Sequence, residues 1–156
     1  MRSSAMAVAV GLAASVALAF AVNAATMAPD EVAIVGNAIP EPLTDEPGDP
    51  LRGELIARDA SNATCLICHQ MPIPDEPNPG NIGPDLAGIA NRYTEGELRL
   101  RIVNPKVVNP NTVMPAYYVL DGLNQVEAQY RGTTIYSAQD VEDVLAFLMT
   151  LTEPAP

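Results

Sequence analysis

Both cysteines and the only histidine of this 156-residue chain lie within five positions, Cys65-Leu66-Ile67-Cys68-His69. This spacing is the motif of c-type haem attachment. Positions i, i+3 and i+4 share one side of a helical turn, so Cys65 and Cys68 are placed to form thioethers with the two vinyl groups on one edge of a porphyrin. His69 then lies under the iron as its proximal ligand.

Two other uses of a CxxC pair fit this sequence less well. A closed structural zinc site usually has four protein ligands, and the chain has no second cluster of cysteine or histidine. A thioredoxin-like redox pair is expected in a βαβ context, which the sequence pattern does not indicate. We therefore predict one covalently bound haem c as the cofactor.

The second axial position of the iron cannot be filled by another histidine of this chain. Methionine is the usual alternative in electron-transfer cytochromes c. Five of the six methionines are less suitable. Met1 and Met6 lie in a predicted signal peptide, and Met27 lies in the leader that follows it. Met71 is too close to His69 in the sequence, and Met149 is expected to pack in the core as part of the last helix. Met114, in a proline-rich loop 45 residues beyond His69, is the predicted distal ligand. An open or water-occupied position is the alternative.

The stretch Gly-Pro-Asp-Leu-Ala-Gly-Ile at 83–89 is a candidate support for the proximal histidine. A ligating histidine normally donates its other ring N–H to an acceptor that sets its tautomer. We expect the backbone carbonyl of Pro84 to accept that bond from His69, and Leu86 to pack on the haem. An ordinary Gly-Pro turn is the alternative. The stretch resembles the Gly-Pro-x-Leu-x-Gly run of small monohaem cytochromes c, which favours the functional interpretation.

The first and last helices are expected to cross. Pro50 is tolerated in the first turn of a helix, and three apolar residues then share one face: Leu51, Leu55 and Ile56. Gly53 lies beside that face and is expected to permit a close approach. Phe147 of the last helix is expected to fill the contact.

Capping-box patterns predict where two helices begin. Thr94 with Glu97 starts the second helix, and Ser137 with Asp140 starts the last one. The last helix then carries a single apolar stripe, which predicts the face that it buries. The stripe consists of Val141, Val144, Leu145, Leu148 and Leu151.

The arginines of the second helix are expected to lie on a solvated surface. Glu95–Arg99 and Glu97–Arg101 are i,i+4 pairs, each worth only a few tenths of a kcal/mol on an exposed face. Arg99 and Arg101 also point to different sides of a helix. The pattern therefore favours surface pairs over a shared site for an anion.

Composition divides the chain into three parts. Residues 1–24 combine Arg2, an apolar alanine-rich run and a small-residue cleavage site near Ala24, which is typical of a secretory signal peptide. A retained membrane anchor is the alternative. Residues 25–50 form an acidic, proline-rich extended leader, with local packing expected at Val32, Ile34 and Val35. Residues 51–153 form the folded domain, and the expected location is the periplasm, with no membrane contact after cleavage.

The charge of the chain excludes one class of partner. The net charge is −11, and removal of Arg2 with the signal leaves seven basic residues against nineteen acidic ones. A chain with that balance is not expected to bind nucleic acid. Once both cysteines carry haem, no thiol remains for a disulfide or for nucleophilic chemistry.

From about residue 51 to residue 153 the chain resembles the SoxX family, the monohaem cytochromes c of the Sox thiosulfate-oxidising system. CxxCH alone is common to many cytochromes c, whereas a methionine in TVMPAYY followed by YRG and SAQDVEDV is much narrower. The matching stretches are CLICHQ (65–70), GNIGPDLAGIANRYTEGELRLRIVNP (80–105), NPNTVMPAYY (109–118) and YRGTTIYSAQDVEDVLAFL (130–148).

The resemblance implies an all-α, class I-like cytochrome c domain wrapped around one covalent haem. It implies a heterodimer with SoxA, the larger cytochrome of the Sox complex, whose own haem has a cysteine ligand. That pair, the L-cysteine S-thiosulfotransferase SoxAX, joins thiosulfate oxidatively to a cysteine of the SoxYZ carrier protein. SoxX accepts the electrons and passes them to a downstream acceptor cytochrome, and is not catalytic alone.

Two other functions remain open at this point. A free periplasmic monohaem cytochrome c that shuttles electrons between respiratory enzymes would share every haem residue. A haem sensor or peroxidase would need an open distal position, which Met114 argues against. A stable partner protein, and not the haem chemistry, separates the first alternative from a member of the Sox complex.

Overall fold

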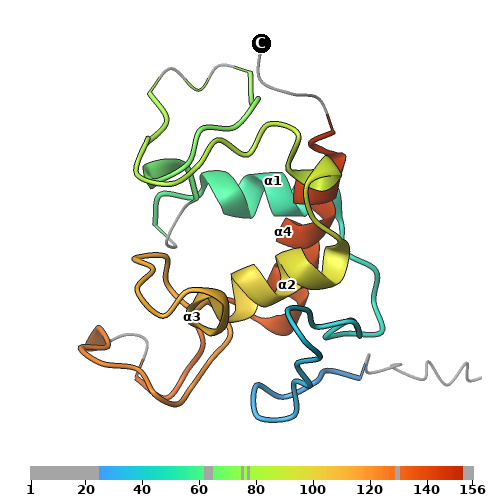
Figure 1. Cartoon of the computed structure of the whole chain (residues 1–156), viewed down its shortest axis with the longest axis vertical. Coiled ribbons are helices and arrows are strands. Elements are labelled where there is room, and N and C mark those ends of the chain that lie inside the picture. Colours follow the sequence, from blue (N-terminus) through green and yellow to red (C-terminus); the bar gives the residue numbers. More distant parts are fainter. Residues whose placement is uncertain (1–24, 62–64, 75, 77, 129–130, 153–156) are drawn as a thin grey trace, which may run out of the picture.

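The computed structural model describes residues 25–61, 65–74, 76, 78–128 and 131–152. Within these residues every regular element is a helix, and β-type pairing is limited to two isolated bridges. The expected all-α architecture is therefore confirmed. The elements, shown in Figure 1, are α1 (Pro50–Arg58), η1 (Cys65–Ile67), η2 (Ile89–Asn91), α2 (Glu95–Val103), α3 (Pro105–Val108) and α4 (Ala138–Thr150), where η denotes a 3₁₀ turn.

None of the helices in the described part of the chain combines the length and the apolar character that crossing a membrane requires. The predicted signal peptide, residues 1–24, lies outside the described residues. Its cleavage, or its retention as an anchor, therefore stays a prediction.

Helix α1 crosses α4 at a glycine, as the sequence predicts. A Cβ added to Gly53 would lie 1.9 Å from the carbonyl oxygen of Asp143 and 2.8 Å from Cβ of Phe147. The two backbones are thus in direct contact, which only a residue without a side chain allows. Figure 1 shows α4 next to α1.

The buried face of α1 is not the one that its apolar residues indicate. Gly53 and Ala57 are buried, whereas Leu51 and Leu55 are 74% and 69% exposed. The close contact at Gly53 turns the small residues of the helix toward α4, so the leucines on the other side point to solvent. Of the three residues of the predicted face, only Ile56 packs against the core, so packing geometry has overridden the hydrophobic pattern for the two leucines.

Both predicted capping boxes are present. The hydroxyl of Thr94 accepts from the backbone N–H of Glu97, whose carboxylate accepts in return from the backbone N–H of Thr94. Ser137 and Asp140 make the same reciprocal bonds at the start of α4. The predicted stripe of α4 is also confirmed, because all five of its residues are buried: Val141, Val144, Leu145, Leu148 and Leu151.

The predictions of a solvated Arg99 and of a Glu95–Arg99 pair are both wrong, and the structure gives Arg99 another partner. Its side chain is buried and pairs with Glu142 of α4, with 2.8 Å between Nε and Oε1 and 3.0 Å between Nη2 and Oε2. Its remaining nitrogen, Nη1, donates to the carbonyl of Ile39 at 2.8 Å. The face of α2 that carries Arg99 packs against α4 and the leader, which the spacing of charges along one helix does not reveal.

Arg101 also differs from the expected side-chain pair with Glu97. Its guanidinium lies 4.0 Å above the ring centre of Tyr93, and Nη1 donates to the backbone carbonyl of Glu97. The charge is therefore held by an aromatic face and a carbonyl oxygen.

The leader, residues 25–49 in the structure, has no helix but belongs to the core. Ile39 and Leu43 are each 1% exposed, and the backbone N–H of Leu43 donates to Glu142 at 2.9 Å. Of the residues expected to pack, Ile34 and Val35 are instead exposed. The leader thus covers α2 and α4 through its second half.

Candidate haem site

The attachment motif forms a single helical turn. η1 covers Cys65–Ile67, and the backbone N–H groups of Cys68 and His69 both donate to the carbonyl of Cys65, at 3.1 and 2.9 Å. Both sulfur atoms and the imidazole therefore come from one turn, as the spacing predicts. All three side chains are half-buried, so they are neither sealed in the core nor free in solvent.

A second segment, residues 80–86, runs beside this turn and is called the proximal strap below. Three backbone bonds attach it to the motif: Gly80 N–H to Leu66 O at 2.7 Å, Gly83 N–H to Cys68 O at 2.7 Å, and Leu86 N–H to Gln70 O at 2.9 Å. The strap is therefore held in register with the motif along its whole length.

The strap holds the imidazole of His69 in one orientation. Nδ1 lies 2.7 Å from the carbonyl oxygen of Pro84, and because a carbonyl only accepts, Nδ1 carries the proton. The expected contact is confirmed. It leaves Nε2 as the unprotonated nitrogen, which is the state in which an imidazole ligates a metal. Leu86 is buried in the core behind the strap.

Gly83 begins the predicted supporting stretch, but the sequence analysis gave this glycine no role of its own. A Cβ at this position would lie 2.4 Å from Cε1, 2.6 Å from Nδ1 and 2.8 Å from Nε2 of His69. The backbone of the strap therefore forms one wall of the imidazole pocket, and only glycine fits there. A Cβ added to Gly80 would likewise lie 1.9 Å from the carbonyl oxygen of Ile67. The sequence did contain a signal for this close approach, because a glycine directly precedes Pro84, the expected acceptor for His69.

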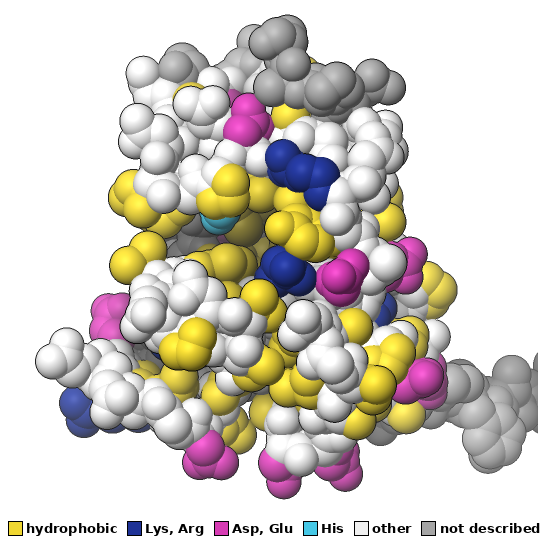
Figure 2. Space-filling view, in the orientation of Figure 1, with side chains coloured by type: hydrophobic (Ala, Val, Ile, Leu, Met, Phe, Trp, Pro, Cys, Tyr) yellow, Lys and Arg dark blue, Asp and Glu magenta, His cyan; other side chains and the backbone are white. Residues whose placement is uncertain are grey.

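Met114 lies in the segment 107–120, which α2 positions. The backbone N–H groups of Tyr117 and Tyr118 donate to the carbonyls of Ile102 and Val103, at 3.2 and 3.3 Å. The side chain of Met114 is half-buried against the core. In Figure 1 this segment, drawn in orange after α3, lies opposite the green segment that carries η1. Figure 2 shows the histidine in a hollow between them, bordered by hydrophobic side chains.

The other described methionines are engaged elsewhere. Met71 is buried in the core at 8% exposure. Met149 of α4 lines a surface pocket of about 380 Å³ together with Arg99 and Glu142. Met27 packs in the leader, where its carbonyl accepts from the hydroxyl of Tyr118 at 2.7 Å. Met114 therefore remains the candidate distal ligand.

Two stacked tyrosines stand beside the motif. The rings of Tyr117 and Tyr136 are 4.5 Å apart between centroids. Tyr136 is 1% exposed, and its hydroxyl meets no oxygen or nitrogen partner among the described residues but lies beside the sulfur of Cys65. A buried hydroxyl whose only polar neighbour is a thiol sulfur, a weak acceptor, is poorly satisfied, and a further group bound beside this wall would suit it.

The electrostatics of Cys65 oppose a thiol-exchange role. Burial raises the pKa of the Cys65 thiol to about 11, which outweighs the opposing effect of a hydrogen bond with Tyr136. Burial likewise raises the pKa of both Tyr117 and Tyr136. Reactive CxxC pairs instead have a lowered thiol pKa. A fixed imidazole in a hollow bordered by hydrophobic side chains fits a haem, and the residues present are suited to hold one.

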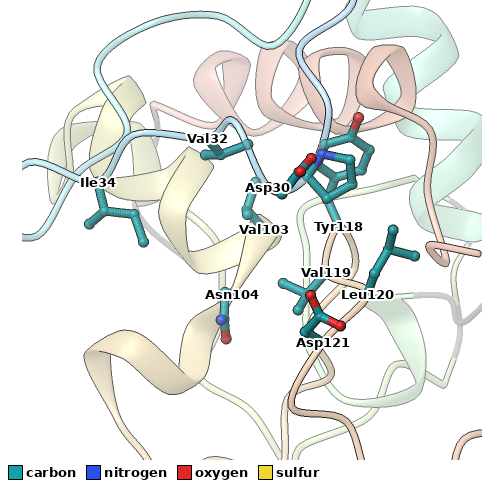
Figure 3. A pocket seen from close by; sticks show the side chains of 10 residues that line it. Asp30, Val32, Ile34, Val103, Asn104, Tyr118, Val119, Leu120 and Asp121 are labelled. Carbon is teal, nitrogen blue, oxygen red and sulfur yellow. The ribbon is translucent and has the colours of Figure 1, made fainter.

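The pocket in Figure 3 is separate from this site. It has a volume of about 350 Å³ and lies between the leader, the end of α2 and the segment 118–121. Its lining combines apolar side chains such as Val32 and Val119 with the carboxylates of Asp30 and Asp121. It contains neither a cysteine nor the histidine. Elsewhere in the described residues, no group of three or more His, Cys, Asp or Glu side chains is arranged to hold a metal ion.

Comparisons with known proteins agree with this geometry. A family model described as "Cytochrome c" matches residues 56–152. Among solved structures, a chain of the "Crystal structure of SoxXA from P. pantotrophus" is 39% identical, with a TM-score of 0.73 and coverage of 82% of this chain and 99% of that chain. A search of curated proteins finds no match.

Proposed function

Since the chain belongs to the cytochrome c family, we propose that it is SoxX, the electron-transfer component of a thiosulfate-oxidising SoxAX complex. As a cytochrome c it carries one covalent haem c, which supplies a one-electron redox centre. The observation that carries the proposal is the 39% identity to a chain of the SoxXA structure, over 99% of that chain.

The described residues suit four roles toward the haem. Cys65 and Cys68 would form the two thioethers, and His69 would ligate the iron through Nε2. Met114 would supply the second ligand of the iron, and a thioether sulfur in that role favours the reduced iron and raises the reduction potential. The carbonyl of Pro84 supports these roles, because its 2.7 Å contact with Nδ1 sets both the tautomer and the orientation of the imidazole.

The inventory of side chains supports a relay and not a catalyst of sulfur chemistry. Joining thiosulfate to the cysteine of a carrier protein forms a sulfur–sulfur bond and releases one thiol proton and two electrons. With both cysteines in thioethers, this chain has no thiol to hold sulfur, and it has no second histidine to accept the proton. It therefore passes on one electron twice for each thiosulfate, while SoxA and the SoxYZ carrier provide the sulfur-binding groups.

The proposed location is the periplasm, on the basis of the signal-like residues 1–24. The proposed partners are the cytochrome SoxA, the SoxYZ carrier and a downstream acceptor cytochrome. A free periplasmic carrier remains the second candidate function, since the haem residues are compatible with both.

The test is a reconstituted assay. Purified holoprotein, thiosulfate, carrier protein and an electron acceptor are mixed with and without SoxA, and reduction of the acceptor is followed. Turnover is expected only when both cytochromes are present. Turnover by this chain alone would contradict the relay, and rapid exchange with several redox proteins without a tight partner would favour the free carrier.

A further inference from the structure

Tyr118, which follows the candidate ligand Met114 in the same segment, is fixed to the leader by its side chain. Its hydroxyl donates to the carbonyl oxygen of Met27 at 2.7 Å. The backbone bonds that join this stretch to α2, from the N–H groups of Tyr117 and Tyr118, measure 3.2 and 3.3 Å. These two distances lie at the long limit of N–H···O bonds, whereas the hydroxyl bond has the usual length of an O–H···O bond. The contact with the leader is therefore the best formed of the three.

The acceptor of this bond is itself anchored in the core. The backbone N–H of Met27 donates to the carbonyl of Leu43 at 2.8 Å, and Leu43 is 1% exposed. The N–H of Leu43 donates in turn to Glu142 at 2.9 Å, and Glu142 forms the buried pair with Arg99. A series of residues joined by hydrogen bonds thus runs from the segment of Met114 through the leader to α4 and α2.

The cavity in Figure 3 interrupts the packing between the leader and this segment. It has a volume of about 350 Å³, and its lining includes Val32 from the leader and Val119 and Leu120 from the segment. Side chains across a cavity lack the close contacts that dispersion attraction requires. The bond from Tyr118, which also lines the cavity, therefore carries more of the attachment between the two segments.

We propose that Tyr118 is a positioning residue for the second iron ligand, because its bond to Met27 ties the segment of Met114 to the leader. The inference rests on the proposed function, in which Met114 is that ligand. Only three residues separate Met114 from Tyr118, so the loop between them has little slack. Release of Tyr118 then allows Met114 to leave the iron more often. The leader, which supplies no ligand itself, helps to keep the iron closed to small molecules.

The binding of added imidazole to the oxidised holoprotein measures how often Met114 leaves the iron, because imidazole binds only the open state. Tyr118→Phe removes the hydroxyl and keeps the ring. Its apparent dissociation constant for imidazole is expected to fall about three- to tenfold, the size that corresponds to the loss of one hydrogen bond. Tyr93→Phe, the same change at a partly buried tyrosine that lies against Arg101, is the matched control and should bind imidazole like the unchanged protein.

A second comparison separates positioning of the ligand from a general effect on stability. Gly53→Ala disturbs the crossing of α1 and α4, and it is expected to lower the melting temperature without changing the affinity for imidazole. Tyr118→Phe is expected to change the affinity for imidazole by more than its melting temperature accounts for. A lower melting temperature of Tyr118→Phe with an unchanged affinity would overturn the proposal, since Tyr118 would then serve the fold alone.

A double-variant cycle tests whether the effect passes through the leader. Leu43→Ala loosens the buried anchor of the leader and is expected to strengthen imidazole binding in the same direction as Tyr118→Phe. The combined variant should gain less than the sum of the two effects, because both changes interrupt the same series of hydrogen bonds. Fully additive effects would overturn the route through the leader.

Met114→Ala distinguishes a failure of this proposal from a failure of the ligand assignment. It is expected to bind imidazole more tightly than any other variant, because its iron is always open. If Met114→Ala binds imidazole like the unchanged protein, Met114 is not the ligand, and the positioning role of Tyr118 is wrong with it. The assay requires no partner protein, so its result is independent of the turnover test with SoxA.

Discussion

Gly83 lies against the imidazole of His69 so closely that a Cβ at this position would be 2.4 Å from Cε1 of the ring. The same ring is held from the side by the carbonyl of Pro84, 2.7 Å from Nδ1. The imidazole therefore has a fixed place between the backbone of the strap and the position expected for the iron. A ligand that is fixed in this way needs no reorganisation when the iron changes its charge.

Gly83→Ala is expected to displace the imidazole, because neither the strap nor a ring held by Pro84 can give way by the required distance. The oxidised holoprotein should lose part of its low-spin absorption spectrum and melt at a lower temperature. Asn81→Ala, at an exposed residue of the same strap, is the control. An unchanged spectrum for Gly83→Ala would show that the ring does not depend on the strap.

Met114→Ala is expected to abolish the weak far-red absorption band that marks a thioether sulfur bound to oxidised haem iron. The reduction potential should fall, since a sulfur ligand favours the reduced state. Met149→Ala should retain the band, because Met149 lies in the pocket beside Arg99. Retention of the band by Met114→Ala would assign the distal ligand to another methionine.

Gly53→Ala tests the crossing of α1 and α4. The added methyl group would meet the Asp143 carbonyl oxygen at 1.9 Å, so the helices must separate. We expect a loss of about 1–3 kcal/mol in the free energy of unfolding, as for other overpacked sites, and a larger loss for Gly53→Leu. Leu55→Ala, on the exposed face of α1, should change it by less than about 0.5 kcal/mol. Equal stability of the two alanine variants would disprove the close contact.

Arg99→Met tests the buried ion pair. It leaves the carboxylate of Glu142 without its bidentate partner in the core, and the carbonyl of Ile39 without its donor. Removal of one member of a buried pair typically costs about 3–5 kcal/mol, whereas replacement of both by apolar residues is often nearly neutral. We therefore expect the double variant Arg99→Met/Glu142→Leu to be more stable than Arg99→Met in chemical denaturation. The reverse order would show that Glu142 stabilises the fold through another bond, such as the one it accepts from the backbone N–H of Leu43 at 2.9 Å.

Asp143 makes the stability of the fold vary with pH in the acid range. Burial acts to raise the pKa of this carboxylate, but hydrogen bonds from Arg52, from the backbone N–H of Asp49 and from Gln139 outweigh burial and lower it. The unfolded chain, with an ordinary pKa near about 4 for this group, therefore binds the proton more readily. The contribution of Asp143 is complete above that pH and is lost as the pH falls through the depressed value.

The measurement for this effect is the melting temperature as a function of pH between about 6 and 2. Asp143→Asn should melt lower at neutral pH and show a flatter decline in acid than the unchanged protein. Asp121→Asn, at an exposed carboxylate, is the control. Parallel curves for Asp143→Asn and the unchanged protein would mean that other carboxylates dominate the acid transition.

The local features of the fold were predictable because each depends on a few neighbouring residues. The capping boxes at Thr94 and Ser137 satisfy backbone N–H groups one turn away, so a pair of residues three positions apart is enough to place the start of a helix. The apolar stripe of α4 likewise follows from one helical period. The bond from His69 to Pro84 spans only 15 residues and links a recognisable motif to a recognisable turn.

The cofactor was predictable from the sequence itself, because five consecutive residues, Cys65 to His69, have the spacing of covalent haem attachment and make His69 the expected proximal ligand. Only the tertiary structure decided how Gly83 borders the imidazole, that Arg99 is buried against Glu142, and that the leucines of α1 face solvent. These features depend on contacts between segments far apart in the chain, such as Arg99 with Glu142 across 43 positions. Such contacts are set by how whole helices pack, and no local pattern of charge or hydrophobicity encodes that geometry.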